Sequence, residues 1–280
     1  MTRVVCALSG GGAKTAAHLG ALRALDEHGM TPQHYVATSM GAVVAAALAA
    51  GVTYDEALRR LTRVRRRDVA VPSLKAVLGY LSDSLFRPEP LRRFIASLVP
   101  ARRFDDLEIP LTVTAADLER GDLVLFGDGG LDVPLHDALY AACALPIYYP
   151  AARVAGRLCA DGGLRAVLPL DVAAGFEPDL IYAVSVGPSR SELPAEGRAT
   201  LPPLVRRHGE VLRVMMAAQT EELLARWADR PHPELVVVQP PVQAETTFAV
   251  DRVAGYVEEG YRTAMRVLGE RRVPQRGVGR

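Results

Sequence analysis

The amino-acid sequence predicts an α/β fold with a mostly parallel central sheet. An apolar run at residues 4–9, bounded by glycines, is typical of a buried strand, and a helix is predicted at 14–28. A second short strand at 35–38 leads into a second helix at 40–50. Strand, helix, strand, helix at this spacing favours parallel strands with helix-covered faces. A length of 280 residues and 49% hydrophobic content indicate one domain over residues 1–280.

The other elements follow from local signals. The first helix places alanines and Leu25 on one face and is expected to end at Gly29, a residue common after helix ends. Residues 54–98 have a rough helical pattern rich in arginine. Strands are expected at 110–116, 123–126, 180–186 and 235–239, a hairpin around Gly156 at 153–160, and helices at 137–144, 204–229 and 250–268. The late elements, within residues 202–268, are expected to pack on the same domain.

Charge and cysteine usage exclude several classes of partner. The formal net charge is +1, so no global field attracts nucleic acid, and we expect no nucleic-acid partner. Only Lys14 and Lys75 are lysines, which leaves 31 of the 33 basic residues as arginine, and single arginine clusters therefore carry less weight. Three cysteines without metal spacing predict no metal site and fit a reducing compartment.

Targeting signals also bear on the location of the protein. The apolar run after Arg3 is too short for the core of a signal peptide, so a cytoplasmic location is predicted. Residues 35–54 carry no charge, but they are rich in alanine and interrupted by Gly41 and Gly51. These features favour a helix buried in a soluble core over a membrane span.

The stretch LSGGGAKTAAHLG, residues 8–20, places three glycines before a helix. A Walker phosphate loop needs a glycine directly before the lysine, and Ala13 occupies that position before Lys14. A dinucleotide loop needs a third glycine, where Thr15 stands, and an acidic residue after the second strand. Neither spacing fits, so the loop is not predicted to bind a nucleotide, and no cofactor is expected.

A serine occupies the end of the second strand, in the pattern A-x-S-x-G formed by Ala37, Ser39 and Gly41. This pattern is close to G-x-S-x-G, which exposes a nucleophilic serine on a sharp strand-to-helix turn. The backbone amides of Gly11, Gly12 and Ala13 can then face the oxygen that becomes anionic when Ser39 attacks an ester. A helix cap at Ser39 is the plain structural alternative.

The proton acceptor for Ser39 is less clear from the residues alone. His208 and His232 come late in the chain, but their surroundings are typical of solvated positions. Two Asp-Gly-Gly triplets, beginning at Asp128 and Asp161, offer a carboxylate instead. The first is typical of a turn, and the second follows a hairpin end, which favours Asp161 without excluding Asp128.

Four ordered blocks resemble the patatin-like phospholipase family. They are GGGAK, the serine turn ATSMGA, the run AACALPIYYP at residues 141–150, and the DGG at Asp161, and they span residues 4–186. The resemblance implies a three-layer α/β/α fold and a serine–aspartate dyad of Ser39 and Asp161. It also implies an oxyanion hole at Gly10, Gly11 and Gly12.

The resemblance also implies a substrate and shows some departures. The expected substrate is a lipid or fatty-acyl ester, with Lys14 and Met40 as candidate substrate contacts. Ala37 and Thr15 replace usual glycines, and a usual asparagine is absent near residues 166–167. A serine acyl hydrolase of phospholipase A, lysophospholipase or esterase type is therefore predicted. An acyltransferase and a catalytically silent lipid-binding protein are the alternatives, and the oligomeric state is undetermined.

Three surface features have two interpretations each. An apolar segment, residues 74–86, can wall an acyl pocket or belong to the core. The arginines of residues 59–67 can dock on phospholipid headgroups, as a peripheral membrane contact, or form a solvated helix end. The helix at 204–229 is expected to pack through one stripe, although a dimer contact is an alternative. The stripe comprises Val211, Leu212, Met215, Leu223 and Trp227.

Overall fold

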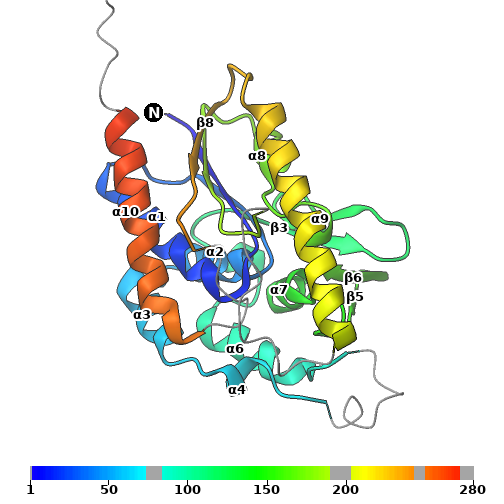
Figure 1. Cartoon of the computed structure of the whole chain (residues 1–280). Coiled ribbons are helices and arrows are strands. Elements are labelled where there is room, and N and C mark those ends of the chain that lie inside the picture. Colours follow the sequence, from blue (N-terminus) through cyan, green and yellow to red (C-terminus); the bar gives the residue numbers. More distant parts are fainter. Residues whose placement is uncertain (1, 74–83, 190–202, 243–249, 272–280) are drawn as a thin grey trace, which may run out of the picture.

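The protein has an eight-stranded mixed sheet between two layers of helices (Figure 1). The computed structural model describes residues 2–73, 84–189, 203–242 and 250–271. The strand order is β5-β6-β3-β2-β1-β7-β8, and β4 pairs with β3. The strands are β1 (Val4–Leu8), β2 (His34–Thr38), β3 (Leu111–Asp117), β4 (Leu123–Gly127), β5 (Ala152–Val154), β6 (Arg157–Asp161), β7 (Leu180–Val184) and β8 (Glu234–Val238).

The sheet is parallel from β8 through β7, β1 and β2 to β3, and antiparallel at the other edge. The parallel strands β1 and β7 are short and buried on both faces, which is why their sequences are continuously apolar. The hairpin of β5 and β6 turns at Ala155 and Gly156, both with positive φ, as predicted. The predicted mostly parallel sheet is confirmed.

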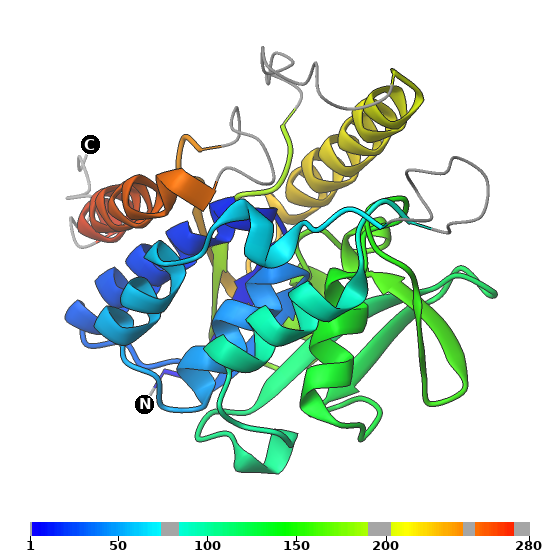
Figure 2. The same cartoon turned by 90° about the horizontal axis from the view of Figure 1, so that it is seen from below.

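Helices cover both faces, so the three-layer α/β/α arrangement is also confirmed. One layer contains α1 (Ala17–Glu27), α2 (Met40–Ala49), α3 (Tyr54–Thr62), α4 (Arg66–Val69), α6 (Pro88–Leu98), α7 (Leu135–Cys143) and α10 (Val253–Arg271). The other layer contains α8 (Leu170–Ala174) and α9 (Pro203–Trp227). Seen from below, α9 in yellow and α10 in orange-red lie on opposite sides of the molecule (Figure 2).

Two separate cores result from the alternation of side chains along the strands. In β1, Cys6 and Leu8 face the larger core, whereas Val5 and Ala7 face the smaller core under α8 and α9. α2 is an alanine-rich helix buried almost all round, as the sequence predicts for residues 35–54. Among the described residues, no helix is long and apolar enough to cross a membrane.

The edge of β3 places two distant segments end to end. β2 pairs with the first half of β3, and its last pair joins Thr38 to Thr114. β6 pairs with the second half, and its Asp161 lies opposite Ala115, the next residue of β3. Because β4 occupies the other edge of β3, β2 and β6 share one edge and run toward each other. The residues that follow β2 therefore meet the end of β6.

Two predictions about helices need correction. The helix predicted at 14–28 begins as a short 3-10 helix, η1 (Gly12–Ala16), and becomes α-helical only at Ala17. The packing stripe predicted for α9 is wrong for Val211 and Met215, which are exposed, and right for Leu223 and Trp227. Among the described side chains of α9, those that pack with α8 on the sheet all belong to its C-terminal half.

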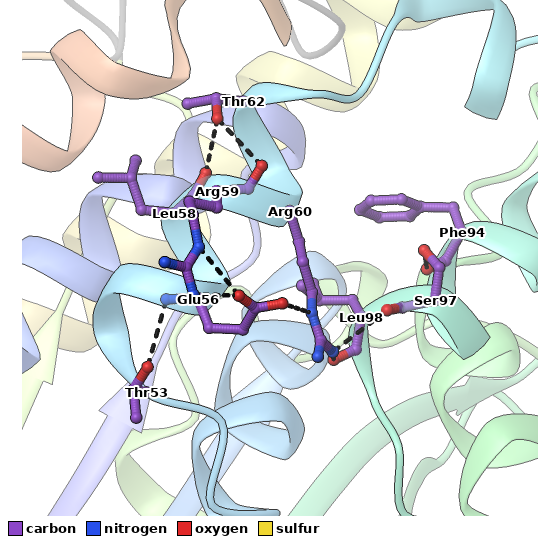
Figure 3. Close-up of polar contacts among 9 residues, drawn as sticks. All are labelled: Thr53, Glu56, Leu58, Arg59, Arg60, Thr62, Phe94, Ser97 and Leu98. Atoms are coloured by element: carbon purple, nitrogen blue, oxygen red, sulfur yellow. Dashed lines mark hydrogen bonds and ion pairs between the residues drawn. The ribbon is translucent and has the colours of Figure 1, made fainter.

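Two of the arginines in residues 59–67 have structural partners (Figure 3). Arg59 and Arg60 both bind the carboxylate of Glu56 within α3. The guanidinium of Arg60 also donates to the carbonyls of Ser97 and Leu98, at 3.3 and 3.2 Å, at the end of α6. These carbonyls lack helical partners, so Arg60 joins α3 to α6.

α1 and α10 cross at very close range through two glycines (Figure 1). A Cβ on Gly20 would overlap the carbonyl of Val257, and a Cβ on Gly260 would overlap the carbonyl of Ala17. Both obstacles are backbone atoms, which cannot move aside without moving a helix. The last helix is thereby held against the first.

We predict that Gly260→Ala lowers the free energy of unfolding by about 1–3 kcal/mol, because the methyl group forces the two helices apart. The matched control is Gly255→Ala in the same helix, where nothing lies within 4 Å of the added Cβ. That control should be neutral or stabilising by up to about 1 kcal/mol. Thermal denaturation of both variants measures the difference, and equal melting temperatures would contradict this account of the crossing.

Candidate active site

Ser39 lies on a strained turn between β2 and α2. Its backbone has φ 55° and ψ −137°, a region that residues with a side chain rarely occupy. Such a conformation costs on the order of 1–3 kcal/mol and is common at functional sites. The turn is tight because Gly41 approaches the carbonyl of Ser9 so closely that a Cβ would overlap it. The strain presents the Ser39 hydroxyl at the carboxyl end of the sheet.

Ala37 stands where the family that the sequence resembles usually has a glycine, and the backbone of β2 accommodates its side chain. Ala37 lies within β2, is fully buried, and pairs with Leu8 and Val113. It is not among the described residues with positive φ, so no glycine is needed there. Thr15 also replaces a usual glycine. Its hydroxyl donates to the carbonyl of Gly12 at 2.7 Å within the 3-10 helix.

The structure brings Asp161 into contact with Ser39. The hydroxyl Oγ of Ser39 donates to Oδ2 of Asp161 at 2.6 Å. The other carboxylate oxygen, Oδ1, accepts the amide of Gly163 at 2.8 Å, which fixes the orientation of the carboxyl group. A Cβ on Gly162 would overlap the carbonyl of Thr114, so the glycine after Asp161 permits this close approach to β3.

Burial changes the acidity of Asp161. Its side chain is 5% exposed, and removal from water disfavours the charged form. This burial raises the pKa of Asp161 from 3.8 to about 6, although the hydrogen bonds from Ser39 and Gly163 act in the opposite direction. A carboxylate with a raised pKa accepts a proton from a hydroxyl more readily.

The glycine loop lies directly beside Ser39. A Cβ on Gly10 would lie 3.1 Å from the Ser39 Cβ and 3.8 Å from its Oγ. The amide of Gly10 donates to the carbonyl of Val167 at 3.0 Å. Within the described residues, the amides of Gly11 and Gly12 donate to no protein acceptor. These two groups can therefore donate to a ligand oxygen near Ser39.

The backbone of residues 166–167 holds both loops of the site. The carbonyl of Ala166 accepts the Thr38 hydroxyl at 2.8 Å, next to Ser39. The carbonyl of Val167 accepts the amide of Gly10, and the Val167 amide is bound by Gln219 of α9 at 2.9 Å. Main-chain groups of this segment thus position the loops in a region where the sequence lacks the asparagine usual in the family it resembles.

A largely apolar cavity of about 150 Å³ contains the Ser39 and Asp161 side chains and the glycine loop. Both predicted substrate contacts, Lys14 and Met40, line it, and Lys14 is 4% exposed. The remaining lining residues come from many elements, and their side chains are mostly aliphatic or aromatic. They are Ala13, Thr15, Ala16, Val44, Leu61, Val64, Val69, Leu91, Phe94, Cys143, Leu145, Tyr149, Gly163, Val167, Pro188, Met216, Val250 and Val253.

Several of these residues were not found by sequence reasoning. Cys143 lies beside Met40, with its thiol 3.7 Å from the Met40 sulfur, and burial raises its pKa well above the usual range. Met216 of α9 and Phe94 of α6 also reach the cavity. Of the apolar segment proposed as a wall, residues 74–83 lie outside the described residues, and Phe86 is in the core. The segment AACALPIYYP supplied a local signal for this wall, since Cys143, Leu145 and Tyr149 of that segment line the cavity.

The alternative proton acceptors for Ser39, which are Asp128, His208 and His232, do not line its cavity. Asp128 follows β4 at the amino end of β3, where its carboxylate is 3.4 Å from Nδ1 of His34. Nε2 of His34 is bonded to the Thr112 hydroxyl at 2.8 Å, and Thr112 is fully buried, so this hydroxyl is not accessible as a nucleophile. Neither His208 nor His232 lines the cavity of Ser39.

Residues 6–174 match the family model described as patatin-like phospholipase. The match covers more than half of the chain, and the chain therefore belongs to the patatin-like phospholipase family. The resemblance predicted from four sequence blocks is confirmed.

The three free cysteines of the chain are buried, and the described residues hold no cluster of histidine, cysteine and carboxylate groups suited to a metal ion.

Two relatives and one solved structure are similar to parts of this chain. An NTE family protein of Mycobacterium bovis is 35% identical over 202 residues, covering 69% of this chain and 52% of that protein. Patatin-like phospholipase domain-containing protein 7 of Mus musculus is 30% identical over 196 residues, covering 68% of this chain and 14% of that protein. The crystal structure of VipD from Legionella pneumophila matches with a TM-score of 0.49 and 15% identity, covering 96% of this chain and 67% of VipD. The chain spans about half the length of the mycobacterial relative.

We predict that the reactivity of Ser39 toward a fluorophosphonate probe falls at acidic pH. Asp161 accepts the serine proton only when ionised, and burial raises its pKa to about 6. The labelling rate should be level above that pH and fall about tenfold per unit below it. The measurement is labelling rate against pH from about 5 to 8, with peptide mapping to Ser39. Asp161→Asn is the control and should remove this step, whereas a flat profile for the native chain would refute the role of Asp161.

Proposed function

We propose that the protein is a serine acyl hydrolase that cleaves carboxylic ester bonds of lipids. The observation that carries the proposal is the buried hydrogen bond of 2.6 Å between Ser39 and Asp161, beside a glycine loop with free amides. Membership of the patatin-like phospholipase family supports the assignment to lipid substrates. The apolar lining of the cavity supports an acyl chain rather than a polar substrate.

The first half of the reaction forms an acyl-enzyme. The Ser39 oxygen attacks the ester carbonyl carbon while its proton passes to Oδ2 of Asp161. The carbonyl oxygen becomes an oxyanion and accepts hydrogen bonds from the amides of Gly11 and Gly12, at the start of η1. Because the Gly10 amide is bonded to Val167, Gly10 contributes close packing against Ser39. The tetrahedral intermediate then expels the alcohol, which takes the proton from Asp161.

The second half of the reaction releases the fatty acid. A water molecule attacks the acyl-enzyme carbonyl and gives its proton to Asp161, and the same two amides stabilise the second oxyanion. Collapse of this intermediate breaks the bond to Ser39, whose oxygen recovers the proton. One buried carboxylate thus serves as base and acid in turn, which suits a group whose pKa lies near neutrality.

Two cavity residues are proposed to contact the substrate. Lys14 is buried at the start of the first helix and lines the cavity, so its ammonium group suits a negatively charged part of a lipid, such as a phosphate. Met40 follows Ser39 directly and is proposed to contact the acyl chain. The buried, unpaired cysteines are compatible with the cytoplasmic location that we propose.

We predict that Ser39→Ala reduces hydrolysis of p-nitrophenyl acyl esters to background, because no nucleophile remains. Asp161→Asn should lower kcat/KM by about 10²–10⁴-fold, since the base is lost while the amide keeps a similar shape. Initial rates with esters of two acyl lengths provide the measurement. Asp128→Asn is the matched control, because it changes the other Asp-Gly-Gly triplet and should retain native rates.

Product analysis distinguishes the alternatives. If acyl transfer to an added alcohol or thiol exceeds release of free fatty acid, the protein is an acyltransferase with the same dyad. If the native chain hydrolyses no ester and Ser39 stays unlabelled by fluorophosphonate, the proposed hydrolase function is rejected in favour of a silent lipid-binding role.

A further inference from the structure

The N-terminal half of α9 has an exposed apolar ridge, formed by Val211, Val214 and Met215. These side chains are 57%, 52% and 63% exposed. Their spacing of three and four residues places them on one face of the helix. Among the described residues only two other large apolar side chains, Leu118 and Leu131, are exposed, and they are separate from each other in the chain. Within the part of the chain that the structure describes, exposed large apolar side chains are therefore concentrated at this ridge.

The ridge adjoins a residue that lines the cavity of Ser39. Met216, the residue after the ridge, lines the cavity, and its methyl carbon lies 3.2 Å from the position of a Cβ on Gly163. Gly163 is the residue whose amide binds Asp161. A surface that contacts the ridge therefore lies close to Ser39 and Asp161.

A second exposed segment, which we call the arginine turn, borders the same cavity. It consists of Arg63, Arg65, Arg66 and Arg67, all exposed, between α3 and the end of α4. Its neighbours Leu61, Val64 and Val69 line the cavity. Unlike Arg59 and Arg60, these four side chains form no ion pair with any described residue. Figure 1 places α4 and the N-terminal end of α9 at the same lower end of the molecule.

Positive charge is concentrated in the two segments that contain the ridge and the arginine turn. Residues 61–69 and 203–219 together hold seven arginines and two carboxylates, a formal charge of +5, whereas the whole chain has +1. Exposed apolar side chains flanked by arginines are complementary to a bilayer surface that carries anionic headgroups. A second copy of this chain would bring the same positive charges together and is disfavoured.

We propose that the apolar ridge and the arginine turn form a docking face for an anionic lipid bilayer. The ridge inserts at the level of the headgroups and acyl chains, and the arginine turn binds anionic headgroups. Docking orients the cavity mouth toward the membrane, so that a lipid reaches Ser39 without crossing bulk water. The use of the face in catalysis rests on the proposed hydrolase function, but binding to the bilayer does not.

The test is sedimentation with vesicles of phosphatidylcholine alone or with about 30% phosphatidylglycerol, using the Ser39→Ala chain so that the lipid stays intact. We expect binding to the anionic vesicles and roughly tenfold weaker binding by the variant V211S/V214S/M215S. Replacement of Arg63, Arg65, Arg66 and Arg67 by glutamine should remove the preference for anionic vesicles. High salt should weaken the arginine contribution but not the apolar one.

The matched control is L118S/L131S, which removes exposed apolar surface away from α9 and should bind like the parent. The proposal is overturned if the ridge variant binds like the parent, or if the control loses as much. It is also overturned if the ridge variant only changes the sedimentation coefficient of the free protein, since the ridge is then a contact between copies. Hydrolysis of soluble p-nitrophenyl butyrate by the same variants with Ser39 intact should be unchanged. Failure of that activity in every chain would reject the hydrolase function and leave the docking result standing.

Discussion

The structure of the site depends on one hydrogen bond, which joins Ser39 to Asp161 across 122 positions of the chain. The bond forms because β2 and β6 end face to face on the same edge of β3, with Thr38 opposite Thr114 and Asp161 opposite Ala115. A shift of one residue in either register would turn the side chains to the other face of the sheet. The position of the dyad is thus set by backbone pairing in the centre of the fold.

Burial changes the acidity of the carboxyl group in this hydrogen bond. The environment that excludes water from Asp161 raises its pKa to about 6 and forms the largely apolar cavity next to Ser39. The strained backbone at Ser39 and the burial of a carboxyl group both cost free energy. Close packing of the main chains around them holds both in place. Gly10, Gly41 and Gly162 permit that packing, because a side chain at any of them would be crowded by or overlap its neighbours.

The two layers of helices have different roles around this centre. The layer with α1, α2 and α10 is closely packed, since α2 is buried and α10 approaches α1 through Gly20 and Gly260. In the layer with α9, the described side chains that pack on the sheet come from the second half of this helix. Met216, at the middle of α9, lines the cavity, and the first half presents an apolar ridge to solvent. The end of the sheet that carries Ser39 is therefore bordered on one side by closely packed helices and on the other by an exposed apolar surface.

The sequence by itself determined those features that depend on neighbouring residues. These are the parallel strands with apolar runs, the serine turn at Ser39, and the glycine loop before the first helix, because periodicity and turn chemistry act over a few residues. Local signals favoured Asp161 without excluding Asp128, since both begin an Asp-Gly-Gly triplet after a strand, and the family resemblance then implied Asp161. The tertiary structure decided between them, because the register on β3 brings one carboxylate to Ser39 and leaves the other at His34. It also decided which face of α9 is buried and that Cys143 and Met216 line the cavity, since contacts between distant segments leave no local pattern in the chain.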